Sequence, residues 1–214
     1  MDTDNLFNKI AVCTDIHFGN KSNSLTHNKD CEDFVDWFIA TAQENNCETA
    51  IFLGDWHHHR ASINVSTLNY SLRSLEKLGS SFDNFYFITG NHDLYYRDRR
   101  DLTSVEFASR FPGVTIINEP FSAGDCAIVP WLVGEDYKKL KKVKAKYIFG
   151  HFELPHFYMN AMIQMPETNE LHAEDMHKAD YVFSGHFHKR QQRKNVVYVG
   201  NCLLRGLMHR HIKH

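Results

Sequence analysis

Five short groups of residues with metal-binding side chains occur along this chain of 214 residues. They contain seven candidate ligands with carboxylate, amide or imidazole groups: Asp15, His17, Asp55, Asn91, His151, His186 and His188. Seven such ligands are more than one ion needs, and they suit two ions. Two divalent ions a few ångströms apart can clamp and activate the oxygens around a phosphate. The sequence therefore predicts a two-metal site that hydrolyses phosphate esters.

The types of ligand indicate which ions would bind. Carboxylate, amide and imidazole groups together suit borderline-hard ions such as Mn²⁺ or Fe²⁺, whereas a structural zinc site would use thiolates. None of the cysteines, at positions 13, 31, 47, 126 and 202, lies in one of the five groups. We therefore predict two divalent ions, with Mn²⁺ as the first choice. Asp55 stands alone in its group and is the natural carboxylate to bridge the two ions.

Two further residues in the third group are candidates for catalysis. His92 directly follows the amide ligand Asn91, so its side chain is expected to point away from the metals and toward the substrate. A histidine in that place can donate a proton to the leaving oxygen. Asp93 could hold the ring of His92 in the productive tautomer, which is a usual role for a carboxylate behind a functional histidine.

Short runs of β-prone residues must position these groups, because each group closes such a run. Strands are predicted at residues 9–14, 49–53, 84–89, 114–117, 126–131, 146–149, 180–184 and 196–199. Apolar residues at helical spacing predict helices over residues 33–42 and 67–78. In open α/β sheets, ligands gather beyond the carboxyl ends of the strands. We predict a layered α/β fold, with two sheets sandwiched between helices in a four-layer αββα arrangement.

The composition is that of an ordinary globular protein, with 43% hydrophobic and 23% charged residues and a net charge of −2. This charge does not by itself favour nucleic acid or membrane, so attraction to DNA would depend on local patches. The first eight residues are polar and acidic, unlike a signal peptide, and no apolar run approaches the ~20 residues that cross a bilayer. A cytoplasmic protein with free thiols and without a membrane partner is expected.

The five groups, in their order, resemble the motif set of the calcineurin-like metallophosphoesterases from about residue 9 to residue 200. The motifs are Asp-x-His, Gly-Asp, Gly-Asn-His-Asp, Gly-His and Gly-His-x-His. The resemblance implies two sets of ligands that share Asp55. One ion would be held by Asp15, His17, Asp55 and His188, and the other by Asp55, Asn91, His151 and His186.

Within that superfamily the sequence is most similar to the SbcD-type DNA-repair nucleases, and in particular to their bacteriophage recombination versions. The similarity is carried by residues 15–19, His58, Arg60, residues 90–96, residues 130–131 and residues 150–154. The phosphoprotein phosphatase branch has an Asp-Arg-Gly stretch after its second motif, whereas this chain has Trp56-His57-His58-His59-Arg60 there, which argues against that branch. The resemblance implies 3′–5′ exonuclease and single-strand endonuclease activity with Mn²⁺, with His58 helping to position the DNA. It also implies a homodimer and a coiled-coil ATPase of the SbcC type as partner.

Two basic segments leave the predicted sheet at the metal edge, at residues 95–100 and 189–194. Arginines and lysines beside aromatic rings can pair with phosphates and stack on bases, although a solvated loop is an equal alternative. The candidate DNA contacts are Arg60, Tyr95, Arg97, Arg99, Lys189 and Arg190. The lysine-rich residues 138–146 are instead expected on a solvated helix face away from the metals, and His57 and His59 in a loop.

The nuclease core is predicted to span residues 1–202. Residues 203–214 do not resemble the family's continuation, so the cap and the ATPase-binding region are expected to be absent and ATPase coupling to be weakened or absent.

Helices in 66–110 could form a dimer face, but their apolar stripes equally fit the core. The alternatives are a small-molecule or phosphoprotein phosphoesterase, or an inactive scaffold. A scaffold would be expected to have lost ligands, and none of the seven is missing.

Overall fold

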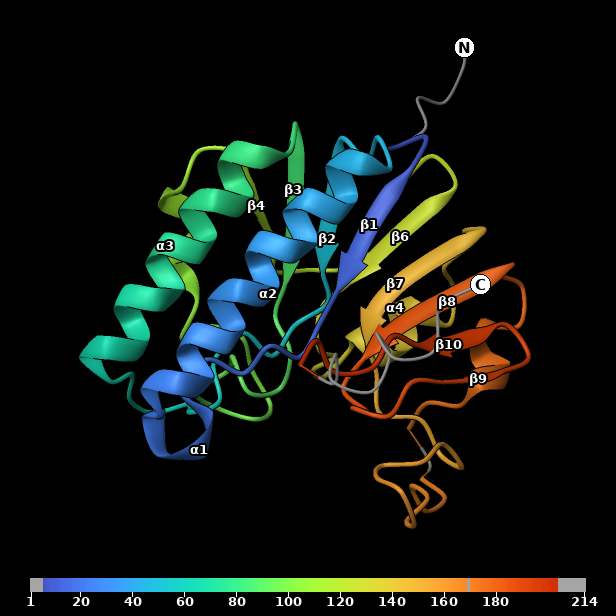
Figure 1. The fold of residues 1–214 in the computed structure, drawn as a ribbon. Helices are drawn as coiled ribbons and strands as arrows, with labels where there is room; N and C mark the ends of the chain where they lie inside the picture. Colours follow the sequence, from blue (N-terminus) through green and yellow to red (C-terminus); the bar gives the residue numbers. More distant parts are fainter. Residues whose placement is uncertain (1–5, 169, 204–214) are drawn as a thin grey trace, which may run out of the picture.

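Two β-sheets lie face to face in this computed structural model, which describes residues 6–168 and 170–203 (Figure 1). The strands of the first sheet are parallel and stand in the order β1-β2-β3-β4. They are β1 (Ile10–Cys13), β2 (Thr49–Phe52), β3 (Asn84–Ile88) and β4 (Val114–Ile117). The first three are joined through α1 (Asn20–Asn23), α2 (Leu25–Glu44) and α3 (Val65–Ser81), and a 3₁₀ turn, η1 (Glu106–Arg110), precedes β4.

The second sheet has the order β5-β6-β7-β8-β10-β9. Its strands are β5 (Phe121–Ala123), β6 (Cys126–Val129), β7 (Tyr147–His151), β8 (Tyr181–Gly185), β9 (Gln191–Arg193) and β10 (Val196–Tyr198). Four strands are parallel, while β5 and β9 pair antiparallel at the two edges. Within the described residues, the connections contain one short helix, α4 (Asp136–Leu140), and a 3₁₀ turn, η2 (Ala173–Met176).

Three apolar clusters fill the spaces between these layers. Successive side chains of β2 point to opposite faces of the sheet and belong to different clusters. Phe52 packs toward α2 and α3, whereas Ile51 packs between the two sheets. The third cluster includes Ile148 and Val182 of the second sheet together with Leu140 of α4. The predicted two sheets between helices are therefore confirmed, although the fourth layer consists of one short helix, a 3₁₀ turn and loops.

All eight predicted strands are present, and the structure adds β5 and β9, whose three residues each are too few to give a strand pattern. The first predicted helix is longer than expected, because α2 begins at Leu25, where Ser24 caps it by accepting the N–H of His27. None of the described helices is long and apolar enough to cross a membrane. The predicted tail, residues 203–214, lies outside the described residues except for Leu203.

Candidate metal centre

The seven predicted ligands meet where strands of both sheets end, and the backbone there is unusual. Asp15, His17, Asp55 and His186 all have positive φ angles, of 54°, 54°, 63° and 88°. Residues other than glycine rarely adopt this region, and such strain persists only where the surroundings hold it. Four of the seven candidates are therefore held in strained conformations that aim their side chains at a common point.

The first cluster contains Asp15, His17 and His188. Oδ1 of Asp15 lies 3.8 Å from Nε2 of His17 and 3.5 Å from Nε2 of His188, and the two imidazole nitrogens are 3.0 Å apart. Oδ2 of Asp15 accepts the hydroxyl of Thr14 and the N–H of His186, at 2.7 and 3.1 Å. Oδ1 is buried and has no hydrogen-bond partner. A buried, unpartnered carboxylate oxygen facing two imidazoles fits a bound cation.

The second cluster brings together Asn91, His151 and His186. Oδ1 of Asn91 lies 3.1 Å from Nε2 of His151 and 3.0 Å from Nδ1 of His186. Nδ1 of His151 donates to the carbonyl of Leu53, at 2.6 Å, so that Nε2 is free to face the cluster. This arrangement supplies one amide oxygen and two imidazole nitrogens to a second ion.

Asp55 lies between the two clusters. Its Oδ1 accepts the N–H of His92 at 2.8 Å. Its Oδ2 lies 3.7 Å from Nε2 of His17 in the first cluster and 3.5 Å from Nε2 of His151 in the second. One oxygen is thus anchored and the other faces both clusters, which is the geometry that a bridging carboxylate needs.

Apart from His151, the charges of these residues match what metal ligands require. Burial lowers the pKa of His17 to about 4, so its ring is neutral. Burial alone would also lower the pKa of His151, but the charge of Asp55 outweighs it and raises that pKa to about 9. In the metal-free protein the raised pKa of His151 leaves its ring protonated near neutral pH, so cation binding must release that proton. Although burial favours the neutral acids, neighbouring histidines hold the pKa values of Asp15 and Asp55 below their usual range. The buried carboxylates are therefore ionised, as cation binding demands.

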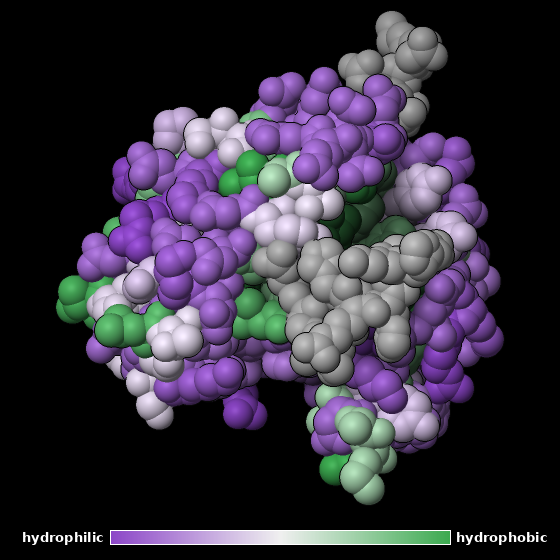
Figure 2. Space-filling model, viewed as in Figure 1, coloured by the Kyte–Doolittle hydropathy of each residue, from purple (hydrophilic) through white to green (hydrophobic). Residues whose placement is uncertain are grey.

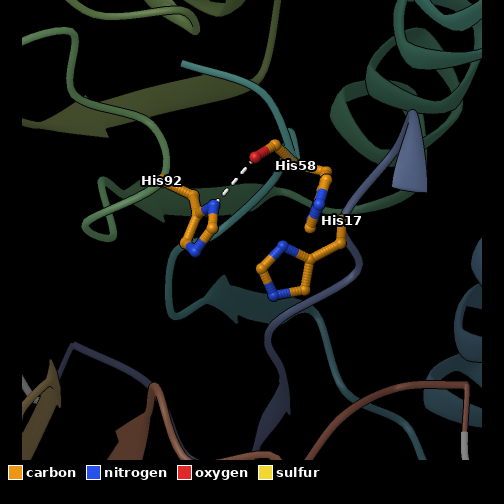
Figure 3. A group of neighbouring side chains, drawn as sticks. All are labelled: His17, His58 and His92. Atoms are coloured by element: carbon orange, nitrogen blue, oxygen red, sulfur yellow. Dashed lines mark hydrogen bonds between the residues drawn. The ribbon is translucent and has the colours of Figure 1, made fainter. Parts of the chain in front are cut away.

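His92 and His58 lie at the rim of the first cluster beside His17 (Figure 3). Nδ1 of His92 donates to the backbone carbonyl of His58 at 2.8 Å. The rings of His92 and His58 are stacked, with centroids 5.5 Å apart, and His92 meets the ring of His17 edge-on at 5.0 Å. The two residues predicted to act on the substrate thus lie side by side next to the ligands. Nε2 of His92 takes no part in the hydrogen bond to His58.

The predicted role of Asp93 is wrong. Its carboxylate is buried and does not contact the ring of His92; instead it accepts four backbone N–H groups. Oδ2 accepts from Asp55 and Gly90, both at 2.8 Å, and Oδ1 accepts from Trp56 and His57, at 2.9 and 3.3 Å. Asp93 therefore ties the loop after β2 to the loop after β3, and a backbone carbonyl orients His92 instead.

The approach of these two loops also depends on glycine. Gly54 has a φ of 94°, and a Cβ there would lie 2.5 Å from the backbone nitrogen of Gly90. No other residue could occupy this position without moving one of the loops.

The segment after Asp93 divides into exposed and inward-facing residues. Tyr95 is 45% exposed, and the guanidinium of Arg99 lies 3.7 Å above the ring of Tyr96. Arg97 is also exposed. Arg100, by contrast, turns inward and pairs with Asp136 at 2.6 Å, so it fastens this segment to α4.

The other predicted contacts lie on two separate loops. Arg60 is half-buried, and its pKa is lowered by burial and by the nearby charge of Arg97. Lys189 and Arg190 are exposed directly after His188. Lys189 and Arg190 thus face solvent next to a proposed metal ligand, whereas Arg60 is partly covered, and whether these residues bind DNA stays a prediction.

The remaining basic and histidine features are structural or solvated. In the lysine-rich stretch, α4 spans only part of residues 138–146, and its lysines pair with acidic groups: Lys138 with Glu135, and Lys139 with Asp136. His59 is exposed. His57 is buried and bonds to the hydroxyls of two serines, so it belongs to the core.

Two residues beside the ligands were missed. Oε1 of Glu153 lies 3.5 Å from Nε2 of His186, and this contact lowers the pKa of Glu153. The ring of Trp131 packs 5.3 Å from that of His186 and 5.9 Å from that of His151. Both residues stand two positions beyond a strand end, after β6 and β7, so the rule that located the ligands could have found them.

A family model described as calcineurin-like phosphoesterase matches residues 8–190. The chain belongs to this family. Exonuclease subunit 1 of Enterobacteria phage T4 is 27% identical to this calcineurin-like phosphoesterase over 201 residues, which cover 90% of the chain and 58% of the phage protein. The chain thus spans less than two thirds of that relative. This relative agrees with the predicted resemblance to bacteriophage nuclease subunits of the SbcD type.

Solved structures share the fold at low sequence identity. The protein TT1561 of Thermus thermophilus is 10% identical, with a TM-score of 0.51, and the match covers 91% of this chain and 89% of that one. Purple acid phosphatase PPD1 from yellow lupin is 15% identical, also with a TM-score of 0.51, over 84% of this chain and 37% of the plant protein. Both confirm the layered α/β architecture.

Proposed function

We propose that this calcineurin-like phosphoesterase is a DNA phosphodiesterase that depends on two divalent metal ions. It acts as a 3′–5′ exonuclease and single-strand endonuclease in phage DNA processing, recombination or repair. The observation that carries the proposal is the position of Oδ2 of Asp55, which faces ligand clusters on both sides at 3.7 and 3.5 Å. The relative named as an exonuclease subunit supports DNA as the substrate.

The proposed ligands are those that the two clusters contain. Asp15, His17 and His188 would hold one ion, Asn91, His151 and His186 would hold the other, and Asp55 would be shared by both. Mn²⁺ is the proposed ion, because oxygen and imidazole donors together suit it. Ions bound by these residues would supply a deprotonated water and would neutralise charge on the phosphate.

The protein's own groups then orient the strand and move the proton. The bond from Nδ1 of His92 to the carbonyl of His58 fixes the ring and leaves Nε2 to protonate the departing 3′-oxygen. His58, stacked on His92, lies where it can hold the nucleotide next to the metals. The cations and the tyrosine predicted from sequence, all exposed except the half-buried Arg60, would contact the DNA backbone and bases: Arg60, Tyr95, Arg97, Arg99, Lys189 and Arg190.

The partners and the location are proposed from the same nuclease function. DNA is the proposed partner and the cytoplasm, including that of a phage host, is the proposed location. The phage relative is named as a subunit, which supports a protein partner, and a coiled-coil ATPase of the SbcC type is proposed. Because the chain spans 58% of that relative, the ATPase and a homodimer are proposed for a protein of the relative's full length.

The test is Mn²⁺-dependent hydrolysis of 3′-end-labelled DNA by the wild type and His92→Ala, run beside a chromogenic phosphodiester. Loss of the proton donor should slow DNA hydrolysis by about 10²–10⁴-fold. His59→Ala is the matched control, because His59 is an exposed neighbouring histidine outside the clusters, and it should keep full activity. Circular dichroism and Mn²⁺ binding should be unchanged in both variants.

Other outcomes would assign a different function. Turnover of the chromogenic ester with DNA left intact would favour a small-molecule or phosphoprotein phosphoesterase. A folded, Mn²⁺-binding protein that hydrolyses neither substrate would favour an inactive scaffold. Equal activity of the wild type and His92→Ala would remove His92 from the mechanism while leaving the metal site in place.

A further inference from the structure

A hairpin formed by residues 155–166 projects from the second sheet, just after β7 (Figure 1). A hydrogen bond of 2.8 Å from the N–H of Met159 to the carbonyl of Ile163 joins its two sides. At the tip, the side-chain oxygen of Asn160 accepts the N–H groups of Met162 and Ile163, both at 2.9 Å. The 155–166 hairpin is therefore a structured projection with a closed tip.

The tip of the 155–166 hairpin is apolar and exposed. Met162 is 88% exposed, Ile163 57% and Met159 41%. Figure 2 shows a hydrophobic projection at the lower edge of the molecule, below surroundings that are mainly hydrophilic. Single exposed apolar residues are ordinary, but three adjacent ones on a projecting tip favour contact with a ligand or partner.

The base of the hairpin is fastened beside the metal centre. The N–H of Tyr158 donates to Oε1 of Gln191 at 2.8 Å, and Nε2 of Gln191 donates back to the carbonyl of Tyr158 at 2.7 Å. Nζ of Lys189 lies 4.2 Å above the ring of Tyr158, and Lys189 directly follows the proposed ligand His188. Four residue steps separate Tyr158 from Met162, so the tip lies at most ~14 Å from the base, which is no more than about four nucleotide steps along a DNA strand.

Basic side chains contact this base. Nζ of Lys189 lies above Tyr158, and the guanidinium of Arg193 donates to the carbonyl of His156 at 2.8 Å. Among the described residues, no acidic group forms an ion pair with Lys189, Arg190 or Arg193. The acidic groups nearby are engaged: Glu167 pairs with two histidines, and Glu174 pairs with a lysine. The result is an apolar tip above cations that have no acidic partner among the described residues. Proteins that enter DNA between base pairs combine the same two elements, an apolar side chain that separates bases and cations that hold phosphates.

We propose that Met162 and Ile163 form a wedge that enters the end of duplex DNA and separates its terminal base pairs. The freed strand can then reach the metal centre, while Lys189, Arg190 and Arg193 hold the phosphates next to the wedge. This inference rests on the proposed nuclease function. It extends that function by assigning duplex ends as substrate and the 155–166 hairpin as the element that opens them.

The test compares the wild type with a Met162→Ser/Ile163→Ser double variant on three Mn²⁺-dependent reactions. The substrates are a blunt duplex, the same duplex with four unpaired terminal positions, and single-stranded DNA. The double variant should cut the blunt duplex about tenfold more slowly, because one base-pair step is worth about 1.4 kcal/mol of stacking. It should cut the other two at the wild-type rate.

Tyr181→Ser is the matched control. Tyr181 is also a large exposed apolar residue, at 45%, but it stands at the start of β8, at the opposite end from His186. The control should match the wild type on all three substrates. A second readout needs no hydrolysis: 2-aminopurine at the duplex end, with Ca²⁺ in place of Mn²⁺, should brighten with the wild type and the control but not with the double variant.

Several results would overturn the wedge. Equal rates of the double variant and the wild type on the blunt duplex would do so, as would equal slowing on all three substrates or no brightening with the wild type. Loss of a dimer in the double variant by sedimentation, with DNA behaviour unchanged, would assign the tip to protein contact. Absence of DNA hydrolysis by the wild type would instead contradict the proposed nuclease function. The fluorescence measurement tests the wedge separately, because it does not depend on hydrolysis.

Discussion

Replacement of Asp93 by asparagine tests how the two metal-bearing loops are held together. The carboxylate accepts the N–H groups of Asp55 and Gly90 on one oxygen, and those of Trp56 and His57 on the other. Asparagine keeps one accepting oxygen and places an NH₂ group where two N–H donors already point. At least two buried N–H groups therefore lose their partner.

The magnitude follows from those two groups. A buried donor without a partner costs about 1–3 kcal/mol, so Asp93→Asn should lower the free energy of unfolding by about 2–6 kcal/mol. That is a large part of the roughly 5–15 kcal/mol typical of a domain. Because the same loops carry Asp55 and Asn91, the affinity for Mn²⁺ should also fall, by about 10–100-fold.

Urea unfolding of the metal-free protein and calorimetric titration with Mn²⁺ would measure both effects. His92→Ala is the matched control, because it changes the next residue without removing an acceptor of buried N–H groups, and it should unfold close to the wild type. The reasoning would be refuted if Asp93→Asn unfolded and bound Mn²⁺ as the wild type does but lost DNA hydrolysis. Asp93 would then act through the ring of His92, as the sequence suggested.

Three further predictions concern the metals, the loops and the helices. Asp55→Ala should lower the occupancy of both ions and His188→Ala that of one, as measured by equilibrium dialysis with Mn²⁺; equal losses would exclude a bridging role. Gly54→Ala should unfold at a lower temperature, by at least the equivalent of about 1–3 kcal/mol of backbone strain, and an unchanged melting temperature would show that the loops can separate freely. Arg73 of α3 forms an ion pair with Glu32 of α2 and holds the pKa of Glu32 below its usual range. This ion pair therefore stabilises the fold above the unfolded pKa of about 4.3. Its stabilising effect is lost as the pH falls through the lower pKa of the folded state. Glu32→Gln should therefore cost about 0.2–1 kcal/mol at pH 7 and less toward pH 3, and an equal cost in urea unfolding at both pH values would refute this account.

The layered architecture and the position of the ligands could be predicted from sequence because they depend on local patterns. Runs of β-prone residues mark strands, and the end of a strand marks where the next polar side chain emerges. All seven predicted ligands come together by this rule, and the same rule would have added Glu153 and Trp131. The edge strands β5 and β9 escaped prediction because three residues carry too little pattern.

The sequence by itself determined which side chains gather at the metal edge, since chain order and strand ends fix that. Only the tertiary structure decided what each side chain does there. Asp93 follows His92 in sequence, yet its carboxylate turns to four backbone N–H groups, and Arg100 turns inward to Asp136 while its neighbour Arg99 stays exposed. The physical reason is that a buried charge must find partners wherever the packed chain supplies them. Those partners come from segments distant in sequence, so no local pattern records them.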